Sequence, residues 1–251
     1  IIIAFYLFFN EGLIFVKKLF QIDAVTIIGG ISLTTAFLGF IYSISYTTAA
    51  VTLFMLALMP FLASVIAFIF LKEKISKQNF VSMVVAFLGT LVMIYASAFS
   101  GSFFGLIMGF VSSLGFAAFS VALRSKSNFK KFYILIYGGI LCALFSTFLM
   151  IINNQDFYIP IKNVYLSMTH GTLVASGLIL FSIGSKQLLS GELTMLSLLE
   201  VVGGIFWAWL PILGINEVPS INTIIGGAII CVAIAMNSYR FDKKRLQNLT
   251  R

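Results

Sequence analysis

Long apolar runs are the feature that most restricts how this chain can fold. Between breaks of charged or turn-forming residues lie nine runs, at 1–16, 24–45, 48–70, 79–97, 101–123, 132–152, 164–185, 191–213 and 220–239. A transmembrane helix needs about 20 largely apolar residues, whereas strands of a membrane barrel alternate apolar and polar residues. The continuous runs therefore predict an all-α, polytopic membrane protein with nine spans.

Composition excludes the soluble alternatives. Hydrophobic residues make up 60% of the 251 residues and charged residues only 10%, far below the roughly 25% of soluble domains. A soluble enzyme, a nucleic-acid-binding domain and a disordered chain are excluded on this ground. The two cysteines, Cys142 and Cys231, are too far apart in the sequence to match a metal-binding motif. The sequence also has no glycine-rich phosphate-binding loop, so nothing in it indicates nucleotide-driven transport. We expect a lipid bilayer around the chain, with no metal, cofactor or nucleic acid bound to it.

The basic residues predict the orientation. If the nine spans alternate, one side of the membrane receives fifteen of the sixteen Lys and Arg residues, and the other side receives only Lys162. By the positive-inside rule the basic side is the cytoplasm, so the tail 240–251 is expected there. We accordingly expect a bacterial-type inner membrane protein with a cytoplasmic C-terminus.

Two stretches of the chain, 48–97 and 191–239, look alike. At a constant offset of 144, Glu73 matches Glu217, Ser76 matches Ser220 and Tyr95 matches Tyr239. The alternating topology places Glu73 and Glu217 on opposite sides, so the two copies would be inverted, as in many secondary transporters. The first repeat, 1–97, then lacks an opening helix that the second repeat, 101–239, has. We therefore expect ten helices in the full architecture.

Several motifs resemble the EamA domain of the drug/metabolite transporter superfamily. The first set is Tyr46-Thr47-Thr48-Ala49-Ala50, Pro60, Leu71-Lys72-Glu73-Lys74 and Gly89; its echo is Ser190-Gly191-Glu192, Leu199-Glu200-Val201-Val202, Trp207-Ala208-Trp209, Glu217 and Gly226-Gly227. Asn216 departs from the glycine common in the family, and Val201 from the proline found after Glu in many members. The resemblance implies two EamA units, alternating access and a cytoplasmic N-terminus.

The candidate binding site centres on Glu200. A carboxylate near the middle of a span costs about 2.5–3.5 kcal/mol on insertion scales, and no basic residue lies inside the expected spans to neutralise it. Glu200 is therefore expected in a central cavity, with Trp207 on the same helical face and His170 or Tyr42 contributed by facing helices. The alternative for Glu200 is a protonated helix–helix hydrogen-bond donor, and for His170 a packing residue.

Other residues are candidates for structural or hinge roles. Pro60 should kink its helix by leaving the Leu56 carbonyl without its backbone donor. Glu73 and Glu217 are expected to cap or hydrogen-bond adjacent helix starts. The small residues Gly105 and Gly109 belong to a stripe that allows close helix approach, or sliding between repeats. Glu11 is expected at the interface near Lys17 and Lys18.

These features together predict a transporter that is not an enzyme. The expected function is secondary-active or facilitative transport of a small metabolite, amino-acid-like or amphipathic, with a proton as a candidate coupling ion. The alternative is a membrane-embedded enzyme or a flippase for a lipid-linked substrate. An enzyme would need converging catalytic pairs, for which only Glu200, His170 and Glu11 are available, on different helices.

Overall fold

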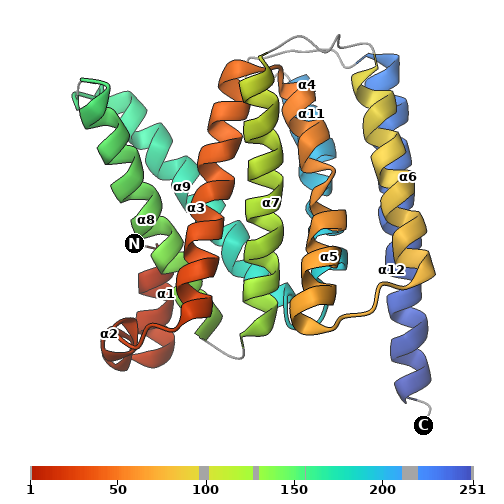
Figure 1. Ribbon diagram of the computed structural model, residues 1–251, viewed down its shortest axis with the longest axis horizontal. Coiled ribbons are helices and arrows are strands. Elements are labelled where there is room, and N and C mark those ends of the chain that lie inside the picture. The colour runs from red at the N-terminus through yellow and green to blue at the C-terminus, as the bar shows by residue number, and fades with distance from the viewer. Residues whose placement is uncertain (1, 96–101, 127–129, 156, 211–219, 250–251) are drawn as a thin grey trace.

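The fold is taken from a computed structural model, which describes the chain except residues 1, 96–101, 127–129, 156, 211–219 and 250–251. For 49–50, 94, 204–205, 207–208 and 240–249 the description covers the backbone only. The described residues form helices without a β-sheet (Figure 1). Their bounds are α1 Ile2–Glu11, α2 Ile14–Leu19, α3 Ala24–Tyr46, α4 Ala49–Leu56, α5 Met59–Leu71, α6 Lys77–Ile94, α7 Phe103–Ser125, α8 Lys130–Ile152, α9 Ile161–Gly184, α10 Ser190–Leu196, α11 Leu199–Trp209 and α12 Ile221–Leu249.

The prediction of an all-α, multi-pass membrane protein is confirmed. Six segments of the described chain are long and apolar enough to cross a bilayer: 24–46, 51–71, 103–125, 130–152, 161–184 and 221–239. Two shorter apolar helices, Ile2–Glu11 and Lys77–Met93, accompany them. Large apolar side chains cover the outside of the bundle, among them Phe70 at 75% exposure and Leu180 at 70%. Such a surface is stable where lipid replaces water.

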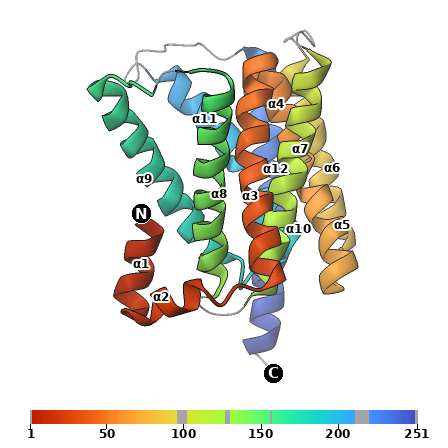
Figure 2. The same ribbon diagram turned by 60° about the vertical axis from the view of Figure 1, so that its left-hand side comes forward.

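The expected first span over 1–16 is wrong as a single helix. Helix α1 ends at Glu11, and Gly12 follows with a positive φ of 61°. Glycine adopts this left-handed conformation without the steric cost of a side chain, so the chain turns there and resumes as the short α2. Figure 2 shows α2 running across the end of the bundle instead of along its axis.

Two of the expected spans are interrupted helices. The span over 48–70 consists of α4 and α5, separated at Ala57 and Leu58, and the described part of the span over 191–213 consists of α10 and α11, separated at Ser197 and Leu198. The flanking residues keep near-helical dihedrals, such as φ −64° and ψ −12° at Ala57. Each pair therefore continues in one general direction across the bundle (Figure 1).

Two hydrophobic clusters form the core. One joins α4, α6, α10, α11 and α12 through Met83, Met195 and Ile230, which are at most 2% exposed. The other joins α1, α3, α7 and α8 through Leu7, Phe119 and Ile134, which are fully buried. The first half of α9 makes little contact with the other helices, since Tyr165 and Met168 are both 65% exposed.

One end of the bundle collects the basic links of the chain. It carries α2, the α5–α6, α7–α8 and α9–α10 links, and the C-terminal part of α12 (Figures 1 and 2). We call it the basic end, and the opposite one the far end. Lys72, Lys126 and Lys186 belong to these links, whereas Lys162 follows the start of α9 at the far end. Helices α8 and α9 lean away from α3 and α7 toward the far end (Figure 1).

Candidate functional site

The interruption between α4 and α5 is supported by a neighbouring helix. Pro60 lies in the first turn of α5, where its missing N–H costs least. The Met55 carbonyl accepts a hydrogen bond from Leu58 N at 3.1 Å and another from the buried Ser113 Oγ of α7 at 2.5 Å. A hydroxyl from α7 therefore satisfies a backbone group at the break, as broken helices inside a membrane require.

The interruption between α10 and α11 places Glu200 at a helix start. Glu200 lies in the first turn of α11, where the backbone N–H groups and the helix dipole favour a carboxylate. Its side chain is exposed on the bundle, while neighbouring Leu198 and Val201 are buried in the core at 1% and 4% exposure. No proline marks this break; the Ser197 hydroxyl bonds back to the Leu193 carbonyl at 3.4 Å.

The other predicted cavity residues lie on separate helices. His170 is exposed on α9. Tyr42 is half-buried on α3, where it stacks on Tyr46 at 6.3 Å and meets the edge of Phe104 at 6.1 Å between ring centroids. In the described part of the chain no hydrogen bond, ion pair or ring contact joins Glu200, His170 and Tyr42. Their common cavity therefore stays a prediction.

Trp207 and Glu217 can be placed only in part or not at all. The backbone of Trp207 belongs to α11, but its side chain lies outside the described residues, and Glu217 lies outside them altogether. Their expected roles stay predictions.

The glycine stripe of α7 lies against α3 and α4. A Cβ added at Gly109 would lie 2.8 Å from Ser43 Oγ and 2.9 Å from Met55 Cβ, and one at Gly105 would lie 2.9 Å from Tyr46 Cβ. These distances are shorter than real side chains tolerate, so glycine is what permits the close approach. The stripe therefore packs α7 closely against α3 and α4.

Glu73 joins several helix ends at the basic end. Its Oε1 accepts from Arg124 Nε at 2.9 Å, and its Oε2 accepts from the backbone N–H of Ser190, the first residue of α10, at 3.1 Å. Arg124 Nη1 also donates to the carbonyls of Ser185 at 3.0 Å and Lys186 at 2.6 Å. Glu73 thus bonds to the start of α10, which is distant from it in the sequence, and Arg124 binds the end of α9.

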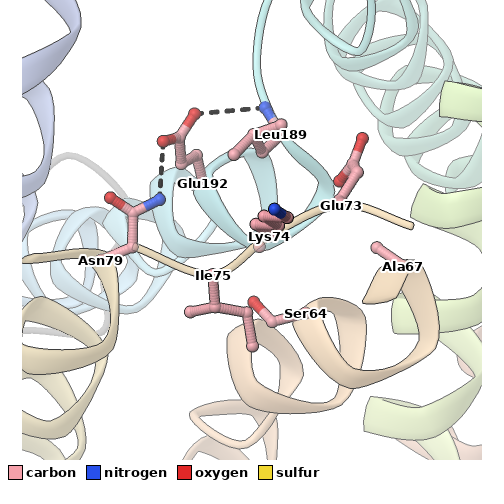
Figure 3. A pocket seen from close by; sticks show the side chains of 9 residues that line it. Ser64, Ala67, Glu73, Lys74, Ile75, Asn79, Leu189 and Glu192 are labelled. Atoms are coloured by element: carbon pink, nitrogen blue, oxygen red, sulfur yellow. Dashed lines mark hydrogen bonds between the residues drawn. The ribbon is translucent and has the colours of Figure 1, made fainter. Parts of the chain in front are cut away.

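A second carboxylate lies beside this junction. Glu192 Oε1 accepts from Asn79 Nδ2 at 2.6 Å, and its Oε2 accepts from Leu189 N at 3.2 Å (Figure 3). Glu73, Glu192 and Asn79 line a small polar cavity together with Ser64 and Lys74. Its volume is ≈ 10 Å³, about the room that one water needs.

Lys131 is the ionic residue that sequence reasoning missed. Although it was expected at the cytoplasmic surface, it lies in the first turn of α8 and is 1% exposed. Its Nζ donates to the Ser182 carbonyl in the last turn of α9 and lies 5.6 Å from the centroid of the Phe132 ring. A cation is favoured at the C-terminal end of a helix, so Lys131 and Arg124 both hold the end of α9. Lys131 directly precedes the expected span over 132–152, so the expectation that no basic residue lies inside a span stays a prediction.

Glu11 also makes contacts beyond those expected. It forms an ion pair with Lys18 at 2.7 Å and accepts from the Tyr133 hydroxyl at 2.6 Å. These bonds tie α1 to α2 and α8. Within the described residues, no group of three His, Cys, Asp or Glu side chains is arranged to hold a metal ion.

Comparison with known proteins agrees with this architecture. Residues 1–95 match the EamA-like transporter family. A solved structure described only as "Crystal structure of protein" aligns with 96% of this chain and 85% of its own, with a TM-score of 0.72 and 17% sequence identity. At that identity the likeness shows the fold alone. A search of curated proteins found no match. The resemblance to the EamA domain is therefore confirmed for residues 1–95, which are similar to a family of transporters.

Proposed function

We propose, from the membership of residues 1–95 in the EamA-like transporter family, that the whole chain is a permease for small metabolites that works by alternating access. The substrate class we propose is an amino-acid-like or amphipathic compound, and a proton is the candidate coupling ion. The chain is then a transporter and not an enzyme.

The pair of interrupted helices is the observation that carries this proposal. Helices α4–α5 run from the far end to the basic end, and α10–α11 run the opposite way (Figure 1). Secondary transporters commonly use such discontinuous helices, in inverted repeats, to build a substrate site near the middle of the membrane. The start of α11, with Glu200 in its first turn, is the corresponding place in this chain.

Matching helix starts support the inverted repeat. Ser76 caps α6: its Oγ accepts from Asn79 N at 3.1 Å and donates to Asn79 Oδ1 at 2.8 Å. Ser220 precedes α12, and its Oγ accepts from Thr223 N at 3.2 Å and bonds to Thr223 Oγ1 at 2.9 Å. The two serines are the pair matched by the offset in sequence, and they lie at opposite ends of the bundle. We therefore propose 1–97 and 101–239 as the two units and 240–251 as a basic tail.

The positive-inside rule assigns the basic end to the cytoplasm of a bacterial-type inner membrane. In this orientation the ion pair between Glu73 and Arg124 lies on the cytoplasmic side.

Counterflow in proteoliposomes tests the proposal. Liposomes loaded with a mixture of unlabelled amino acids and small amphipathic metabolites are diluted into each labelled compound in turn. We expect at least one compound to accumulate transiently in liposomes containing the protein, and Glu200→Gln to reduce this accumulation. Accumulation equal to that of protein-free liposomes for every compound would contradict a metabolite carrier of this class.

A further inference from the structure

We propose that the ion pair between Glu73 and Arg124 is the cytoplasmic gate of this protein, the contact that holds the basic end closed and must separate before that end can open. This inference rests on the proposed transport function, because only a transporter needs such a gate. The contact itself can be tested without any substrate.

The pair connects segments that would have to move apart. Glu73 follows α5, and Arg124 lies in the last turn of α7. Between them they also bind the start of α10, through Ser190 N, and the end of α9, through the carbonyls of Ser185 and Lys186. Two side chains thus join four helix ends from both proposed repeats. Loss of either side chain releases several of these ends at once.

The environment of the pair makes it stronger than an ordinary surface ion pair. The side chain of Arg124 is 25% exposed and that of Glu73 is 14% exposed. Separating a largely buried pair leaves each charge poorly solvated, whereas exposed pairs contribute little. The planar guanidinium reaches three acceptors on two segments, the Glu73 carboxylate and two carbonyls at the end of α9, which the single ammonium of a lysine would match poorly.

The residues next to the ion pair are tightly packed. Ser190 is fully buried, and its hydroxyl has no hydrogen-bond partner among the described residues. Next to it, Gly191 of α10 packs against Ser64 of α5 so closely that an added Cβ would overlap Ser64 Oγ. The only room in the cavity of Figure 3 is that of about one water. Solutes therefore reach Ser190 only if the ends of α5, α7 and α10 separate.

A second ion pair at the same end provides a matched control. Lys126 follows α7 by one residue and pairs with Asp23 at the start of α3. It joins α3 to the α7–α8 link, and among the described residues Lys126 forms no hydrogen bond or ion pair with α9 or α10. Its Asp23 side chain is 50% exposed. Loss of this pair removes a nearby positive charge without releasing the junction at Glu73.

Labelling of a cysteine at position 190 tests the gate. Ser190→Cys is introduced after Cys142 and Cys231 are replaced by serine, and membrane vesicles are treated with a membrane-impermeant methanethiosulfonate reagent. The exposed position 187, as Gln187→Cys, defines the accessible side and the maximal rate. We expect slow labelling at 190, and labelling faster by about tenfold or more after Arg124→Gln or Glu73→Gln, because either change removes the partly buried charge pair. Arg124→Lys should give an intermediate rate.

The control variant decides between a gate and general loosening. Lys126→Gln should leave labelling at position 190 unchanged. Equal rates in the parent and in both gate variants would overturn the proposal, as would an equal rise with Lys126→Gln. If Arg124→Gln does not fold, the milder Glu73→Gln, which retains an amide oxygen as acceptor, carries the test alone. Since labelling needs no substrate, a failed gate and a failed transport assay are distinguishable.

Discussion

Gly89 and Gly226 face each other across the crossing of α6 and α12. A Cβ added at Gly89 would lie 2.9 Å from the Gly226 carbonyl oxygen, and a Cβ added at Gly226 would overlap the Gly89 carbonyl and lie 2.8 Å from Met93 Cβ. Close packing of this kind is a main source of helix association inside lipid, where the hydrophobic effect no longer drives it. The last helices of the two proposed repeats therefore pack through their glycines.

This contact predicts that a larger residue destabilises the protein at position 226 but not at position 227. Gly226→Ala should destabilise the protein by about 1–3 kcal/mol through overpacking, seen as a lower Tm in detergent. Gly227→Ala is the matched control, because a Cβ there meets no atom within 4 Å. Alanine should be neutral there, or stabilising by up to about 1 kcal/mol from its better helix propensity. An equal Tm for both variants would contradict close packing at Gly226.

Asp23 predicts a specific loss of stability in acid. Partial burial raises its pKa, but hydrogen bonds from Lys126 and from the Thr26 side chain and backbone outweigh this and lower the pKa from 3.8 to about 2. Since the folded-state pKa lies below the unfolded one, the stabilisation is present above about pH 4 and is lost as the pH falls toward 2.

The contribution is small, at most about 1 kcal/mol, because half of the Asp23 side chain is exposed. Asp23→Asn keeps an acceptor for the α3 cap but cannot ionise. Thermal unfolding between pH 5 and pH 2 should therefore show a shallower fall in Tm for Asp23→Asn than for the parent protein. Parallel curves would show that this ion pair has no role in acid stability.

The orientation predicts which loops an impermeant reagent reaches. Tyr158, between α8 and α9, is 86% exposed at the far end, and Gln187 is exposed at the basic end. In a background without native cysteines, Tyr158→Cys should be labelled in intact cells, and Gln187→Cys only after the membrane is opened. The reverse pattern would invert the topology.

The long helices were predictable, and the breaks were only partly so. The runs at 24–45, 101–123 and 164–185 became α3, α7 and α9 with bounds shifted by a few residues, because apolar length alone defines a span. Pro60 indicated the α4–α5 break. The residues Asn10-Glu11-Gly12 favour a turn, but the apolar run around them suggested one continuous span. The α10–α11 break has no proline and depends on tertiary packing.

Side-chain contacts depended on which helices become neighbours. Nothing in the sequence separates Lys131 from the solvent-facing lysines next to it, because its burial requires the end of α9 to lie beside α8. Likewise Glu73 was expected to bond to an adjacent helix start, but its partners Arg124 and Ser190 are distant in the sequence. Such pairings are set by the packing of helices that are distant in the sequence.

Glu200 gives the last prediction. Its side chain is exposed, lies in the first turn of α11, and forms no hydrogen bond among the described residues. Glu200→Gln keeps the size of the side chain but cannot ionise, so Tm should not fall, because an uncharged amide costs less than a carboxylate within a span. If the carboxylate binds a cationic substrate group or a coupling proton, transport should fall by about tenfold or more and lose its dependence on pH. The effect of His170→Asn on transport can be compared with that of Glu200→Gln, since His170 lies on α9. Unchanged transport and pH dependence in Glu200→Gln would remove the carboxylate from the mechanism.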